Sequence, residues 1–198
     1  MSGRYREVMF TPPVRSAQQQ AYGRAAAIPA QPAVDPLGED EMNFIAERDS
    51  FYLATVSPTG WPYLQHRGGA PGFLRVLGPS RLGFADYAGN RQLISTGHVA
   101  ASDRVSLFLM DYPRQTRLKI IGHASVRDVA ADPALARSLA VAGERARVER
   151  LFVIDVVSFD WNCPQHITPR FTAAQIKESI APLQARIREL EAKLAARG

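Results

Sequence analysis

Cysteine is almost missing from this chain of 198 residues, since Cys163 is the only one. No disulfide can form within the chain, and a reducing cytoplasm is its simplest setting. No apolar run approaches the roughly 20 residues that cross a bilayer. Met1 to Arg6 leads into polar and proline-rich sequence, not into the apolar segment of a secretory signal. The sequence therefore predicts a cytoplasmic protein with no membrane partner.

Lysine is also scarce: 3 of the 24 basic residues are lysine and the rest are arginine. The net charge of +5 does not mark a nucleic-acid-binding protein, because residues 36–169 hold 14 basic and 14 acidic residues and the surplus lies in the two tails. Binding to nucleic acid requires a clustered basic face. Genomic base composition explains the arginines most simply, and the alternative is that some of them bind a phosphate in bidentate fashion.

Several common functional motifs are missing as well. The sequence has no Gly-x-Gly-x-x-Gly after a strand, no Walker loop and no carboxylates at metal-ligand spacing. Cys163 and His166 form one Cys-x-x-His pair, which is half of what a structural zinc site needs. No third group is evident that would orient His166 as a base for Cys163. The sequence thus predicts no metal site and identifies no catalytic residue.

What the chain does contain is a series of short segments rich in aromatic and β-branched residues, separated by turns. Predicted strands cover residues 51–56, 61–67, 73–77, 82–85, 105–110, 117–127 and 151–159. Predicted helices cover residues 16–27, 36–49 with Asp35 as N-cap, 91–98, 133–148 and a C-terminal segment capped by Thr172. Gly122 inside a strand indicates a bulge or bend. Strict alternation of strand and helix is absent, so the fold class is mainly β with peripheral helices: an antiparallel split β-barrel of about seven strands with a C-terminal helix.

The chain divides into an N-terminal arm (1–35), a barrel (36–171) and a C-terminal helix (172–198). The arm is rich in Ala, Pro and Gln and is expected to lie over the domain or a partner, or to be partly disordered. Apolar residues of the C-terminal helix follow the 4-3-4-3-4 spacing of a heptad repeat, and Pro182 is expected to kink it. Two interpretations stay open here: contact with a second copy, or packing on the helix's own barrel.

Polar residues at strand ends and in loops are the candidates for a binding site. Gly68 follows Arg67 and lets the backbone approach a ligand, and Asn90 and Arg91 open a predicted helix whose amino end would favour an anion. Further candidates are two residues sharing a strand face and three in or beside a proline-stiffened loop: Arg117, Lys119, Trp161, Gln165 and Arg170. Each has an ordinary structural explanation, but together they suit a planar ring that ends in a phosphate, as in FMN.

The stretch from Phe51 to Val126 resembles the pyridoxamine 5′-phosphate oxidase-like superfamily of FMN-binding split barrels. The segments that carry the resemblance are Phe51–Val56, Gly60–Tyr63, Phe84–Arg91, Ser102–Leu107 and Arg117–Ala124, and residues 161–170 are similar to a signature of one of its branches. The resemblance implies a homodimer with two FMN molecules at the subunit interface. By analogy, Arg67 and Arg91 would bind the phosphate, and Phe84 and Ala85 would line the ribityl chain. Arg117 would lie near the ring, with Trp161 and Arg170 coming from the second subunit.

The sequence also departs from the oxidase. Gln92 stands where the oxidase pairs its arginine with a lysine, and the insertion from Gly68 to Gly72 has no counterpart. Oxidation of vitamin B6 is therefore not predicted. The expected function is a flavin-dependent oxidoreductase acting on a small-molecule substrate or redox partner. The alternatives are a non-catalytic flavin carrier or sensor, and the same barrel holding a deazaflavin or haem, for which His66 or His166 would be the axial ligand.

Overall fold

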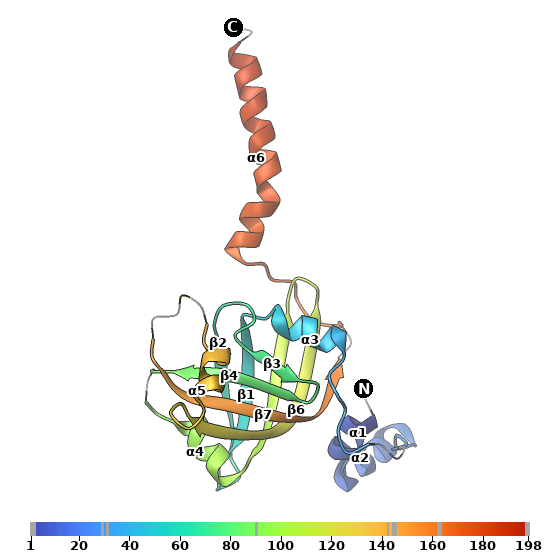
Figure 1. Cartoon of the computed structure of the whole chain (residues 1–198). Helices are drawn as coiled ribbons and strands as arrows, with labels where there is room; N and C mark the ends of the chain where they lie inside the picture. Colours follow the sequence, from blue (N-terminus) through green and yellow to red (C-terminus); the bar gives the residue numbers. More distant parts are fainter. Residues whose placement is uncertain are drawn as a thin grey trace.

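One antiparallel sheet of seven strands forms the body of the protein (Figure 1). The computed structural model describes residues 3–28, 30, 32–89, 91–141, 143, 146–161 and 164–196. Its strands are β1 (Ser50–Val56), β2 (Pro62–Gly68), β3 (Arg75–Gly78), β4 (Arg81–Tyr87), β5 (Arg104–Asp111), β6 (Thr116–Asp128) and β7 (Val148–Trp161). Their order across the sheet is β2-β1-β5-β6-β7-β4-β3, with every neighbouring pair antiparallel. The predicted antiparallel split barrel with peripheral helices is confirmed.

The core lies on the concave side of this curled sheet. Along β1 and β5 every second side chain is buried, as expected for strands with one face on the core and one facing outward. Phe51, Leu107, Ile120 and Phe152 are among the largest fully buried side chains. Burial of apolar area by such residues is the main source of stability.

Gly122 marks a local irregularity in the long pairing of β6 with β7. The register shifts between Ile121 and Gly122, which confirms the predicted bulge or bend. A Cβ atom at position 122 would lie 2.5 Å from the backbone oxygen of Asp155. Glycine is therefore required here by the close approach of the two backbones.

Three short helices border the barrel: α3 (Glu39–Ala46), α4 (Ile94–Ala101) and α5 (Pro133–Leu139). The predicted start of the first one was wrong. Gly38 is its N-cap, and its N–H donates to the Glu41 carboxylate at 2.9 Å. Asp35 instead accepts a hydrogen bond from the Ser158 hydroxyl at 2.6 Å, so a tertiary contact outcompetes local capping. The predicted Asp132 cap of α5 is confirmed by its bond to the N–H of Leu135, but the helix ends at Leu139, short of the predicted end.

The N-terminal arm contains α1 (Gly3–Met9) and α2 (Pro12–Tyr22), not one helix from residue 16 as predicted. Prolines suit the first turn of a helix, and α2 accordingly begins at Pro12 directly after Thr11. It ends at Gly23, whose φ of 69° gives a left-handed C-cap. Tyr5 of α1 is buried, so at least this part of the arm packs on the molecule.

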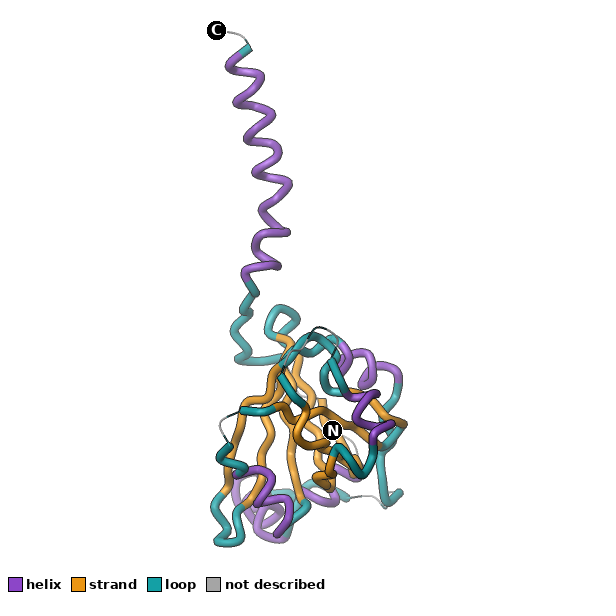
Figure 2. Tube along the Cα trace, turned by 60° about the vertical axis from the view of Figure 1, so that its left-hand side comes forward, coloured by secondary structure: helices purple, strands orange, loops and turns teal. Residues whose placement is uncertain are grey.

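The C-terminal helix α6 (Ala173–Ala195) projects away from the barrel in both views (Figures 1 and 2). Thr172 caps it as predicted, because its hydroxyl accepts from the N–H of Gln175. None of its residues is buried, so the structure does not show the packing on its own barrel that was one of the two open interpretations. Within the described parts of the chain, no helix combines the length and the apolar character that crossing a membrane would need.

Candidate anion and cofactor site

Two arginines share one buried carboxylate where β2, β4 and β7 come together. Arg67 Nη1 of β2 donates to Asp86 Oδ1 of β4 at 2.6 Å, and Arg150 Nε of β7 donates to Asp86 Oδ2 at 2.9 Å. The register of β4 and β7 places Asp86 directly opposite Arg150. Burial acts to lower the pKa of Arg150, but its hydrogen bonds to Asp86 and Glu149 prevail and raise it. Both guanidinium groups are therefore held in place by the shared carboxylate.

This cluster forms part of the wall of a cavity of about 230 Å³. The residues that line it come from β2, from β4 and the segment after it, from the first turn of α4, and from β7: Tyr63, Gln65, Arg67, Asp86, Tyr87, Gly89, Arg91, Gln92, Leu93, Ile94, Ser95, Thr96 and Arg150. Among the lining residues that the structure describes, three arginines thus face one carboxylate. The lining has a surplus of positive charge, which suits an anionic ligand.

Alternation along β2 explains why three of these residues occur at every second position. Tyr63, Gln65 and Arg67 are the less exposed residues of the strand, and the residues between them are exposed. Buried Ser95 donates its hydroxyl hydrogen to Gln65 Oε1 at 2.9 Å. This bond fixes the Gln65 amide so that its nitrogen is the end left to donate.

Aromatic rings support Arg67 from the core side. Its guanidinium carbon lies 5.6 Å from the ring centre of Phe84 and 5.4 Å from that of Phe152, and these two rings stack with centres 4.9 Å apart. Arg67 Nε is buried without a hydrogen-bond partner among the described residues. Phe84 and Ala85, the candidates for the ribityl chain, are both buried and do not line the cavity. Phe84 therefore acts on the site by holding Arg67.

Arg91 and Gln92 reach the cavity from the loop that joins β4 to α4. The helix begins at Ile94, so the prediction that it opens at Asn90 and Arg91 was wrong; Asn90 itself is outside the described residues. Arg91 and Leu93 have φ values of 60° and 53°, a left-handed conformation that non-glycine residues rarely adopt. Such strain clusters at functional sites, where the surroundings hold the backbone in place.

The other candidates do not line this cavity. Arg117 lies on the outer face of β6 with its guanidinium carbon 5.9 Å from the ring centre of Phe108, and its buried Nε has no hydrogen-bond partner in the described structure. Lys119, on the same face, pairs with Asp160 at 2.9 Å. Gly68, at the end of β2, is exposed and also lies outside the lining.

The end of β7 and the loop after it lie elsewhere. Trp161 donates its Nε1 hydrogen to Glu41 Oε1 at 2.5 Å and meets the Phe44 ring edge-on at 4.8 Å between centres. Gln165 is exposed. Arg170 lies over Tyr112, 5.0 Å from its ring centre, and lines a separate cavity of about 460 Å³.

The Cys-x-x-His pair of Cys163 and His166, from which no metal site was predicted, includes a residue outside the described ranges, Cys163. In the described part of the chain, no three His, Cys, Asp or Glu side chains gather as metal ligands.

Sequence reasoning missed four important members of the cavity: Tyr63, Gln65, Asp86 and Arg150. Period-two alternation from Arg67 could have found the first two, since residues 63, 65 and 67 share a face of a strand. Asp86 and Arg150 are 64 positions apart and meet only through strand register, for which the sequence carries no local signal.

Comparison with known proteins identifies the family to which this chain belongs. Among solved structures, a putative pyridoxamine 5′-phosphate oxidase from Lactobacillus delbrueckii is 21% identical, with coverage of 64% of this chain and 95% of that chain and a TM-score of 0.49. An FMN-binding protein from Syntrophomonas wolfei is 11% identical (61% and 81% covered, TM-score 0.42), and an F420 reductase is 16% identical (63% and 98% covered, TM-score 0.45). No curated protein matches the sequence significantly. The family model described as pyridoxamine 5′-phosphate oxidase matches residues 37–159, and the chain therefore belongs to that family.

Proposed function

We propose that the protein binds FMN and serves as a flavin-dependent oxidoreductase. The observation that carries the proposal is the arginine-rich cavity, in which Arg67, Arg91 and Arg150 outnumber Asp86, the one carboxylate among the described lining residues. A phosphate dianion would balance this surplus, and a guanidinium offers the planar pair of donors that suits it. Gln65 and Gln92 would add neutral donors. When bound, the flavin supplies hydride or electron transfer, while the protein supplies orientation and charge.

The size of the cavity supports a homodimer. Pockets that enclose a cofactor measure about 300–1,000 Å³, whereas this one measures about 230 Å³. One chain can thus hold the phosphate end, and a second copy would provide walls for the rest. Arg117 and Lys119 lie outside the cavity, as the ring would, and the family resemblance places Arg117 near that ring. There either cation would stabilise negative charge on the reduced ring.

The outer face of the sheet offers an apolar surface for that neighbour. Tyr52, Ala54, Leu64, Ser106, Phe108 and Tyr112 border a shallow depression on β1, β2 and β5. Leu64 is 62% exposed, which is high for a large apolar side chain in a strand. We place the protein in the cytoplasm, where its single cysteine would remain reduced.

A visible absorption spectrum of the purified protein, followed by mass spectrometry of the released ligand, tests the cofactor. The proposal predicts a flavin spectrum and the mass of FMN. A Soret band would indicate haem, and the mass of a deazaflavin would indicate that cofactor instead. A colourless protein whose melting temperature does not respond to added FMN would refute the proposal.

The reaction class requires a separate experiment. Anaerobic stopped-flow mixing with NADH or NADPH should bleach the bound flavin rapidly if the protein is an oxidoreductase that uses either nucleotide. Bound flavin that neither nucleotide bleaches would favour the carrier or sensor.

A further inference from the structure

Six apolar side chains form one exposed stripe along α6, which we call the α6 seam. Its members are Ile176, Ile180, Leu183, Ile187, Leu190 and Leu194, and they are 38–70% exposed. Leu and Ile side chains favour burial away from water. A single helix with such a stripe therefore exposes apolar surface to water that contact with another element would bury.

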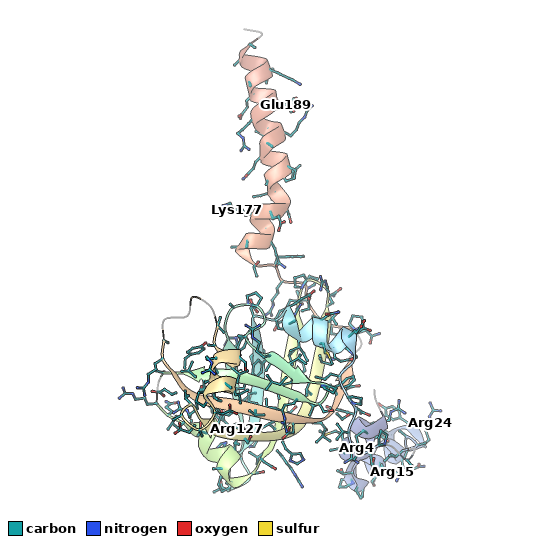
Figure 3. All side chains as sticks on the ribbon, in the orientation of Figure 1. Arg4, Arg15, Arg24, Arg127, Lys177 and Glu189 are labelled. Carbon is teal, nitrogen blue, oxygen red and sulfur yellow. The ribbon has the colours of Figure 1, made fainter. Side chains whose placement is uncertain are left out.

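Among the residues that the structure describes, none from the barrel covers the α6 seam. The helix leaves the barrel after Thr172 and extends into solvent in both orientations (Figures 1 and 2). Figure 3 shows Lys177 near its start and Glu189 further along, both on a helix with no other element beside it. The capping box of Thr172 and Gln175 fixes where the helix begins, so the projecting helix is a defined element.

We propose that the α6 seam packs against the α6 seam of a second copy of this chain, in a parallel two-stranded coiled coil. The spacing assigns Ile180, Ile187 and Leu194 to heptad position a, and Ile176, Leu183 and Leu190 to position d. Isoleucine at a with leucine at d favours two parallel strands, and this seam follows that rule at four of its six positions.

The charges beside the seam favour the same arrangement. In a parallel pair, position g of one helix meets the following position e of the other, which brings Arg186 to Glu191 of the second copy, and Glu191 to the second copy's Arg186. The antiparallel arrangement that aligns all six seam residues would place Arg186 against Arg186 of the second copy. It would also bring Lys177 to Glu191 of the second copy, but this outer pair does not remove the central repulsion.

Pro182 is compatible with this arrangement. It occupies position c, and Glu178, whose carbonyl loses its usual N–H partner, occupies position f. Both positions point away from the seam. Any kink therefore disturbs the outer side of the helix and leaves the seam continuous.

The direction of the coiled coil also fits the homodimer put forward above, and this step rests on that proposed function. Parallel helices leave both barrels at the same end of the coil, where they can share cofactor sites. Antiparallel helices would separate them by the length of α6, about 35 Å for its 23 residues.

Disulfide cross-linking of the full-length chain tests the proposal. In a Cys163→Ser background, Ile176→Cys puts a thiol at the first position of the seam. In a parallel coil the two thiols are adjacent, whereas in the aligned antiparallel coil they lie about 27 Å apart. Glu178→Cys, two residues further on the outer face, is the matched control. We expect Ile176→Cys to cross-link at least about tenfold faster than Glu178→Cys under mild oxidation.

A charge exchange gives a second, independent readout in the Ile176→Cys protein. Arg186→Glu should slow cross-linking by placing glutamates together, and adding Glu191→Arg should restore the rate. Arg188→Glu, at outer position b, should leave it unchanged. Equal cross-linking at positions 176 and 178, or no effect of the charge exchange, would overturn the proposal. Since neither assay uses flavin, such a failure would leave the FMN proposal standing, and a failure to bind FMN would leave the coiled coil standing.

Discussion

The shared carboxylate of Asp86 gives the sharpest test of the site's architecture. Asp86→Asn keeps the shape of the side chain and removes the charge that holds Arg67 and Arg150. The side chains of Asp86, Arg67 and Arg150 are only 10%, 17% and 21% exposed. Arg67 would therefore be left largely buried without its carboxylate, and Arg150 would keep only its pairing with Glu149. Breaking a buried ion pair from one side costs about 3–5 kcal/mol. Because these groups retain some access to water, we expect a loss near the lower limit, about 3 kcal/mol.

Asp155→Asn is the matched control. Asp155 pairs with Arg81 at 2.6 Å, the same distance as the pair of Asp86 with Arg67, but these side chains are 54% and 52% exposed. An exposed pair contributes at most about 1 kcal/mol. Urea unfolding at one fixed protein concentration gives the loss of unfolding free energy for each variant. Added inorganic phosphate should restore part of this loss in Asp86→Asn and none of it in Asp155→Asn. Equal losses in the two variants would refute the reasoning that burial makes the Asp86 cluster special.

Three further predictions concern binding, titration and packing. Arg91→Ala should weaken FMN binding by about 10- to 150-fold in a calorimetric titration, because a charge-assisted contact contributes about 1.5–3 kcal/mol; unchanged affinity would remove Arg91 from the site. Burial and the neighbouring Tyr52 raise the pKa of Tyr112 above the ordinary phenol value. The protonated Tyr112 hydroxyl therefore adds its full stabilisation to the folded state when the pH is below the ordinary phenol pKa. This stabilisation is lost as the pH rises through the raised pKa of Tyr112 in the folded protein. Tyr52→Phe should lower the pKa of Tyr112 in an ultraviolet titration, and an unchanged curve would contradict this assignment. Gly122→Ala should cost about 1–3 kcal/mol, because its Cβ would lie 2.5 Å from the Asp155 oxygen; a melting temperature equal to that of the parent would be evidence against this close contact.

The strands could be predicted from the sequence because local pattern determines them. Alternating apolar residues and turn residues identified all seven strands, and a glycine inside a predicted strand with β-branched residues indicated the bulge at Gly122. The Thr172 cap was equally local, since a hydroxyl three residues before a glutamine satisfies the first N–H groups of a helix.

The helix boundaries were harder to predict because tertiary contacts decide them. Asp35 and Pro36 form a good local helix start, yet Ser158 binds the Asp35 carboxylate and the N–H of Leu37 donates to the Pro79 carbonyl at 2.6 Å. These bonds hold the segment extended against β7 and the turn after β3. Residues 91–93 likewise form a strained loop that no propensity scale would favour.

The site was predictable only in part, for the same reason. Arg67 could be selected because it precedes Gly68, and Arg91 because it was expected to open a helix; both line the cavity, although that helix begins later, at Ile94. Asp86 and Arg150 could not, because their role arises from the register of two strands far apart in the chain. The sequence shows that Arg117 and Lys119 share one face of a strand, but it does not show which surface of the protein that face forms. Only the three-dimensional structure shows that both residues lie outside the cavity.

The most direct test of the central claim is a calorimetric comparison of FMN with riboflavin, which differ only in the phosphate. Binding through the cavity of Arg67, Arg91 and Arg150 predicts that FMN binds far more tightly, with the advantage shrinking as salt is added. Equal affinities for the two ligands, or binding of neither, would contradict the assignment of this cavity to the cofactor phosphate.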